Sequence, residues 1–171
     1  RIDPLTMRFF LRKGILFHNK EPFTSESVRY SLNRYLDPST NFPGRPFISS
    51  ISSVTVVDDY TIDIHTFFPD GLLLNRIASI ILIVPPNYIK TNGESSLEEN
   101  PVGTGPFRFV KWNKGEQIVL EANPDYWRNG YPKVKQLVFR FLPQEDQMDA
   151  LLRGDVDLVT EMPGTYTLRA M

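Results

Sequence analysis

The two histidines are the side chains in this sequence best suited to acid–base or metal chemistry. His18 and His65 lie far apart in the chain, and neither belongs to a spaced set of metal ligands. His65 alternates onto the polar face of its expected strand, which favours a solvated structural role. The sequence contains neither a Gly-x-Ser-x-Gly elbow nor a His-Glu-x-x-His helix. We therefore expect no catalytic residue, no metal site and no cofactor.

Three acidic pairs are the remaining candidates for catalysis. Paired carboxylates serve as acid and base in glycosidases when they flank a substrate, and nothing in the sequence favours that geometry here. The pairs fall in an expected turn, a polar linker and a helix N-terminus, and they are Asp58-Asp59, Glu98-Glu99 and Glu145-Asp146. We interpret them as solvated charges and the chain as a non-enzyme.

Two glycines around Thr104 form the strongest candidate for a binding loop. A dinucleotide-binding loop needs a third glycine and a following helix, whereas Gly103-Thr104-Gly105 is followed by Pro106 and an expected strand. The two glycines are more typical of a sharp turn between domains, where the backbone approaches another segment closely. Direct ligand contact through exposed amides is the alternative that remains open.

The composition excludes several classes of protein. The chain has 171 residues, 41% of them hydrophobic, which suffices for one domain or for two small lobes. Its 19 basic and 20 acidic residues argue against nucleic acid as the main partner. There is no cysteine, and no apolar run approaches the ~18 residues that a membrane span requires. Because it starts at Arg1 in a strand-like run, we expect a segment of a longer protein.

The first half of the chain predicts a strand, a helix and a hairpin. Residues 5–12 are strand-like, and Thr24 is a suitable N-cap for a helix whose apolar face recurs every three or four residues until Asp37-Pro38. Residues 51–57 and 60–67 are predicted to form two strands, the second with one buried and one solvent-exposed face. A short helix is expected over 71–79, followed by an apolar run, 80–84, that is short enough to be a buried strand. Residues 90–100 are polar and are the best candidate linker.

The second half predicts a hairpin and a strand–helix–strand unit. Residues 107–112 and 116–121 flank Asn113-Lys114-Gly115, a hairpin turn sequence. A turn at 123–127, a strand over 134–142 and a helix over 144–153 follow, and Gly154 ends that helix. A last strand over 155–160 would complete a βαβ unit. The fold class is mixed α/β in two parts that divide between residues 90 and 100.

The many aromatic residues are expected to lie mainly in the core. Most of the phenylalanines in the first 70 residues occupy alternating strand positions, which points to burial rather than to a ligand platform. Trp127, beside Asn123-Pro124, is interpreted as a packing anchor.

Five ordered blocks resemble a known family, the peptide-, nickel- and oligosaccharide-binding receptors of ABC importers, often called solute-binding family 5. FFLRKGILFH at 9–18 resembles its F-x-L-R-x-G-x-x-F-H block, and PFTSESV at 22–28 resembles its P-F-T-A-E-D-V helix start. The other matches are NPVGTGPF at 100–107, LEANPDYW at 120–127 and GDVDL at 154–158. Two positions depart, since the family usually has glycine near Lys20 and an acidic residue at Ser27. These departures concern local turn geometry.

The resemblance implies an α/β fragment of a periplasmic-binding-protein-like fold (type II, cluster C), which is bilobed and has mixed sheets. Residues 1–95 would lie mostly in the small extra domain, and residues 96–171 would form part of the first main lobe up to the hinge. The expected ligand-binding residues are Gly103, Thr104, Gly105, Glu161 and Met162.

The function implied by the resemblance is that of a non-catalytic receptor outside the cytoplasm, periplasmic or on the cell surface, with lipid anchoring through an upstream segment as one option. It would capture peptides or other small solutes, including nickel chelates, haem, opines or sugars, and deliver them to a membrane-embedded ABC permease. The full-length protein is expected to be a monomer. The alternative is the ligand-sensing domain of a cytoplasmic transcriptional regulator that uses the same fold.

Overall fold

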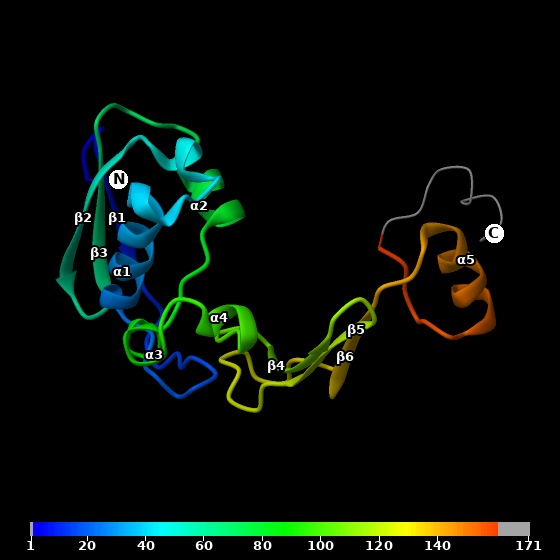
Figure 1. The fold of residues 1–171 in the computed structure, drawn as a ribbon. Coiled ribbons are helices and arrows are strands. Elements are labelled where there is room, and N and C mark those ends of the chain that lie inside the picture. The colour runs from blue at the N-terminus through cyan, green and yellow to red at the C-terminus, as the bar shows by residue number, and fades with distance from the viewer. Residues whose placement is uncertain (1, 161–171) are drawn as a thin grey trace.

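The computed structural model of the protein describes residues 2–160 and contains two separate three-stranded antiparallel sheets. Figure 1 shows the second sheet leading away from the first, with the last helix at its far end. No helix in the described range is long and apolar enough to cross a bilayer. The mixed α/β class expected from the sequence is confirmed.

The first sheet has the strand order β1-β3-β2, with β1 at Thr6–Phe10, β2 at Ile51–Asp58 and β3 at Thr61–Thr66. Helix α1, Ser25–Leu36, packs against β2 and β3. The expected strand, helix and hairpin are therefore confirmed, with shorter bounds. The core between the sheet and the helix contains four fully buried side chains from different parts of residues 1–80, which are Leu32, Ile48, Ile62 and Leu73.

The expectation that β3 has a wet face is wrong. Thr61 is 8% exposed and Asp63 is 7% exposed, while His65 is half-buried and its Nδ1 lies 3.2 Å from the Thr6 hydroxyl. β3 is the central strand, so side chains of both neighbouring strands flank its polar residues, and Thr6 and Arg8 of β1 stand opposite His65 and Asp63. Arg8 on β1 satisfies the buried Asp63 carboxylate with two hydrogen bonds of 2.8 and 2.7 Å.

Helix α1 begins as the sequence predicts. Thr24 is its N-cap, and Thr24 and Ser27 form a reciprocal capping box in which the Thr24 N–H donates to Ser27 Oγ at 3.3 Å. Ser27 thus fills the role of the acidic residue that the family usually has there, because its hydroxyl accepts from the same backbone donor. The helix ends at Leu36, directly before Asp37 and Pro38.

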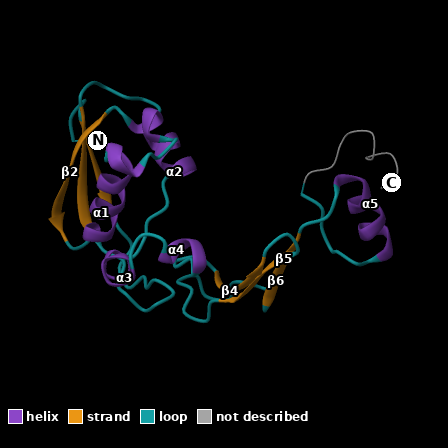
Figure 2. Cartoon of the chain, viewed as in Figure 1, coloured by secondary structure: helices purple, strands orange, loops and turns teal. Residues whose placement is uncertain are grey.

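The segment after α1 contains the short 3₁₀ helices η1, Pro38–Thr40, and η2, Arg45–Ile48. Helix α2, Leu73–Ile80, packs on η2 and confirms the expected short helix. The apolar run after α2 forms no strand (Figure 2). Its backbone is held by α1 side chains, since the Val84 N–H donates to Ser31 Oγ at 3.0 Å and Tyr35 Oη donates to the Leu82 carbonyl at 3.2 Å. These bonds replace a ladder, so the strand prediction is wrong.

The polar segment 90–100 is more structured than a free linker. It holds the end of α3, Pro86–Asn92, and all of α4, Ser96–Glu99. An ion pair of 2.6 Å between Arg34 and Glu94 joins it to α1. Helix α3 is anchored at its start, where the Glu21 carboxylate accepts from the N–H groups of Asn87 and Tyr88 at 3.0 and 3.2 Å.

The second sheet has the order β4-β5-β6, with β4 at Phe107–Asn113, β5 at Gln117–Ala122 and β6 at Gln136–Arg140. Both the predicted hairpin and the strand that follows it are confirmed. Helix α5 spans Gln144–Arg153 as predicted, and Gly154 ends it in the left-handed conformation with φ 75°. Within the described residues, 155–160 form no strand, so the expected βαβ unit is not present. Among residues 2–160 no strand pairs with this segment, and the backbone groups of Asp155 bond instead to the Ala150 carbonyl and to Arg140.

Several aromatic side chains expected in the core are exposed instead. Phe17 is buried, whereas the most exposed are Phe10, Phe67, Phe47 and Phe68 at 80, 70, 59 and 56%. Phe10 is the last residue of edge strand β1, and the others lie in η2 or just after β3, where no described element covers them. Alternation along a strand therefore did not decide their burial.

Candidate functional site

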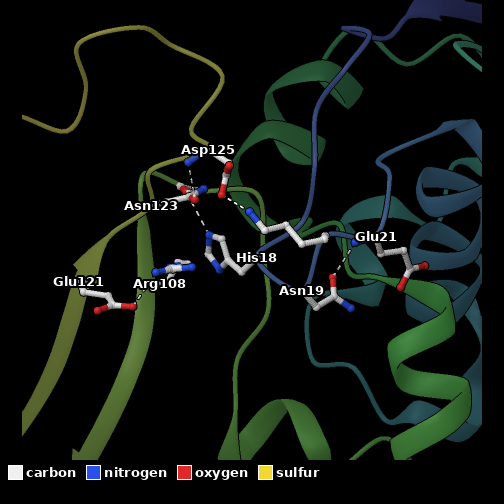
Figure 3. A network of polar contacts seen from close by, with 9 residues as sticks. His18, Asn19, Glu21, Arg108, Glu121, Asn123 and Asp125 are labelled. Atoms are coloured by element: carbon white, nitrogen blue, oxygen red, sulfur yellow. Dashed lines mark hydrogen bonds and ion pairs between the residues drawn. The ribbon is translucent and has the colours of Figure 1, made fainter.

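Residues from three distant parts of the chain meet around the side chain of His18 (Figure 3). Its backbone N–H donates to the Gly103 carbonyl at 2.8 Å, and the Gly103 N–H donates to His18 Nδ1 at 3.3 Å. His18 Nε2 lies 3.0 Å from the Gly105 carbonyl. An Nδ1 that accepts a hydrogen bond and an Nε2 that donates one define the neutral Nε2–H tautomer. The imidazole is thus hydrogen-bonded to both ends of the turn Gly103-Thr104-Gly105, which we call the glycine turn.

Asn123, at the end of β5, holds the same turn from the other side. It is 4% exposed, its Nδ2 donates to the Gly105 carbonyl at 3.1 Å and its N–H donates to the Pro106 carbonyl at 2.8 Å. Its Oδ1 accepts from the Asp125 N–H at 3.1 Å, which fixes the following turn. Both the Nδ2 and the Oδ1 of this buried amide are therefore hydrogen-bonded, as a buried polar group requires. We call the region where these segments meet, at His18, residues 103–106 and residues 123–127, the junction.

Two further contacts join the 12–20 segment to the 125–127 turn. Lys20 forms an ion pair with Asp125, and the guanidinium of Arg12 lies 3.9 Å from the centre of a Trp127 ring. The hydrogen bond from Lys20 holds the pKa of the Asp125 carboxyl below its ordinary value of 3.8, although partial desolvation opposes it. Trp127 is therefore an anchor in a cation–aromatic contact, 42% exposed, rather than a core residue.

Lys20 explains one departure from the family pattern. Its φ is +71°, in the left-handed region that favours glycine, so the turn expected of a glycine is kept. The side chain gained at this position makes the ion pair with Asp125. The strain of a non-glycine residue is offset at least in part by this contact.

The glycine turn itself differs in one respect from the expectation. The backbone bends over residues 104–106, but neither glycine has a positive φ. A Cβ at Gly103 would lie 3.9 Å from His18 Cε1, and one at Gly105 would lie 4.0 Å from the Phe107 carbonyl oxygen, both ordinary contacts. Close approach therefore does not by itself require glycine at either position.

The turn leaves a small set of donors free. The carbonyls of Gly103 and Gly105 and the N–H of Gly103 are used by His18 and Asn123. Within residues 2–160 the N–H groups of Thr104 and Gly105 have no hydrogen-bond partner. Arg108 of β4, also drawn in Figure 3, donates to Glu121 Oε1 at 2.8 Å, while its buried Nε has no partner within residues 2–160. Such donors suit a carbonyl or carboxylate oxygen.

The five expected ligand-binding residues thus have different outcomes. Gly103, Thr104 and Gly105 lie together in the junction, whereas Glu161 and Met162 lie outside the described residues. The sequence did not predict the roles of His18, Lys20, Asn123 and Asp125. His18 was interpreted as an isolated side chain, and the other three were assigned only to turns. The signal was present in the matched blocks, since 9–18, 100–107 and 120–127 supply most of these contacts.

No group of three or more acidic, histidine or cysteine side chains among residues 2–160 is placed to hold a metal ion. Both nitrogens of the His18 ring are engaged with backbone groups, so neither faces a nucleophile. The unpaired N–H groups of Thr104 and Gly105 remain as main-chain donors beside this ring.

Comparison with known proteins decides the family. Residues 1–170 match the family model described as "Bacterial extracellular solute-binding proteins, family 5 Middle". This chain belongs to that family. The resemblance drawn from the five blocks is confirmed.

Curated relatives match most of this chain, which spans about a third of their length. The glutathione-binding protein GsiB of Pectobacterium atrosepticum is 28% identical over 162 residues, which cover 94% of this chain and 32% of the relative. An ABC transporter peptide-binding protein of Brucella ovis is 30% identical over 159 residues, 89% of this chain and 29% of its own.

Solved structures of the same kind superimpose closely. AgaA from A. tumefaciens R10, in complex with agropinic acid, has a TM-score of 0.90 at 29% identity over 99% of this chain and 34% of its own. The oligopeptide-binding protein AppA of Bacillus subtilis, in complex with a nonapeptide, has a TM-score of 0.86 at 26% identity over 98% of this chain and 34% of its own. The expected class, part of a bilobed periplasmic-binding-protein-like fold, is confirmed by these neighbours.

Proposed function

We propose that this chain is part of a non-catalytic receptor outside the cytoplasm that captures peptides or similar small solutes and delivers them to an ABC importer. The family match over residues 1–170 carries this proposal. Relatives named for glutathione and for peptides support a ligand with a peptide backbone. The neighbour bound to agropinic acid supports keeping other small acids in the same class.

The glycine turn is the part of the receptor that we propose faces the ligand. The free N–H groups of Thr104 and Gly105 would donate to a carbonyl or carboxylate oxygen of the solute, while His18 and Asn123 hold the turn from behind. Main-chain donors recognise a backbone without reading its side chains, which suits a receptor for varied peptides. Glu161 and Met162 remain proposed as additional contacts near the hinge.

The domain boundary is also a proposal. We propose that residues 1–95 belong to the small extra domain and residues 96–171 to the first main lobe. The buried cluster that includes Met7, Leu32 and Ile81 lies wholly in the first part, and the second sheet lies wholly in the second part. The junction at His18 would then be the contact that sets the angle between the two parts. A periplasmic or cell-surface location and a monomeric full-length protein belong to the same proposal.

Mass spectrometry of the full-length protein, purified gently and then denatured, tests the function. Release of a set of short peptides supports the peptide receptor, whereas a metal chelate, sugar or haem keeps the receptor and replaces the ligand class. A protein that carries nothing and has no export signal upstream contradicts the proposal. With a bound peptide in hand, amide NMR resonances of Thr104 and Gly105 should shift on saturation. If they stay in place, the glycine turn does not face the ligand.

A further inference from the structure

A groove of about 320 Å³ lies beside the junction but is lined by different side chains. It is formed where β4 begins and by the loop that joins β5 to β6. Its walls are mainly aromatic rings and prolines, with two basic side chains, and the lining residues are Pro106, Phe107, Tyr126, Arg128, Tyr131, Pro132, Lys133 and Val134. The size lies at the lower end of the range for small-molecule sites, and the apolar wall with few polar groups is also typical of them.

Both basic side chains of the groove approach the same ring. Arg128 Cζ lies 4.2 Å and Lys133 Nζ 5.0 Å from the centre of the Tyr131 ring. Neither cation forms an ion pair with any residue in the range 2–160. Asp125, the acidic residue nearest to Arg128 in the chain, is paired with Lys20 instead. The lining contains no acidic residue, so it carries two positive charges without compensation.

This combination of charge and surface selects one class of ligand. We propose that the groove binds a small anion, a carboxylate or a phosphate, that carries a flat apolar group. Arg128 and Lys133 would donate charge-assisted hydrogen bonds to the anion, because a cation stacked on a ring keeps N–H groups available. The apolar group would lie against Phe107 and Tyr126, whose rings are half-buried and fixed by the strand and the turn. The inference does not depend on which solute binds at the glycine turn.

Calorimetry on the full-length protein with phenyl phosphate and benzoate tests the proposal. Phenol and inorganic phosphate, the apolar and the anionic part of phenyl phosphate, are measured separately for comparison. We expect at least one of the two anionic aromatic probes to bind, and to bind more tightly than phenol or inorganic phosphate. Arg128→Gln and Lys133→Gln should each weaken it by about tenfold, the size of one charge-assisted hydrogen bond. Lys114→Gln is the matched control, because Lys114 also lies over an aromatic ring, 5.7 Å from the Trp112 ring centre, and outside the groove.

Four results would overturn the proposal. They are a failure of both anionic aromatic probes to bind, equal binding of phenol, equal binding of inorganic phosphate, and equal weakening by Lys114→Gln. Arg128 and Lys133 are exposed, so the variants are expected to keep the wild-type melting temperature. If Arg128→Gln melts early, Arg128→Lys, which keeps the charge but loses the planar fork, replaces it, and unchanged affinity then counts against a role for the guanidinium.

Discussion

Replacement of His18 by alanine is the sharpest test of the junction. The change removes the acceptor of the Gly103 N–H and a donor to the Gly105 carbonyl, at 3.3 and 3.0 Å. Each such bond contributes roughly 0.5–1.5 kcal/mol to stability. The Gly105 carbonyl keeps Asn123 as a second donor, which softens one loss, whereas the Gly103 N–H keeps no partner among the described residues. We therefore expect the free energy of unfolding to fall by about 2 kcal/mol.

Urea unfolding followed by tryptophan fluorescence measures this loss, and hydrogen exchange places it in the structure. Exchange at the Gly103 amide should accelerate more than exchange in the core strand β3, because only the former loses its acceptor. His18→Gln should recover part of the stability, since an amide side chain also offers one donor end and one acceptor end. Lys111→Ala is the control, since Lys111 is an exposed residue of β4 whose side chain has no hydrogen bond or ion pair in the described range. A His18→Ala effect below about 0.5 kcal/mol, no larger than the control, refutes the role of His18 in holding the glycine turn.

Three further predictions concern stability. Lys20→Gly should be more stable than Lys20→Ala by about 1 kcal/mol in urea unfolding, because both lose the ion pair and only glycine relaxes at φ +71°; equal stabilities would contradict the strain. The Arg8 guanidinium, hydrogen-bonded to Asp63, holds the pKa of that carboxyl below 3.8. The stability that this ion pair contributes is therefore present above pH 3.8 and is lost as pH falls through the lower pKa of the folded state. Asp63→Asn should therefore make the unfolding midpoint fall less steeply on the acid side of a pH series, and an unchanged slope would refute this contribution. Ile62→Ala should cost about 2–5 kcal/mol, against less than about 1 kcal/mol for the 47% exposed Val57→Ala, and similar losses would contradict the assigned core.

Local patterns predicted most of the elements because their causes are local. Thr24 and the recurring apolar residues define α1, and Asn113-Lys114-Gly115 defines the second hairpin, since caps and turns act over a few residues. The bounds differ by a few residues at strand ends. Helix α5 has the predicted bounds because Pro143 and Gly154 flank it.

The errors share a different origin, the identity of a segment's neighbours. The run 80–84 is apolar enough for a strand, but Ser31 and Tyr35 of α1 take its backbone bonds. Alternation along β3 suggested a solvent-exposed face, but cross-strand neighbours, among them Arg8 opposite Asp63, flank the polar side chains of this central strand. Nothing in either segment alone reports which element lies beside it.

The candidate site shows the same division. From the sequence alone, Gly103-Thr104-Gly105 is predicted to be a sharp turn, and the five ordered blocks indicate the family that the family model confirms. The folded chain was needed to see that His18 and Asn123 hold this turn, and therefore which of its amides remain free. The difference lies in the distance along the chain over which each interaction acts. Periodicity, caps and turns depend on near neighbours in the sequence, whereas the hydrogen bond between His18 and Gly105, 87 positions apart, depends on how the whole chain folds.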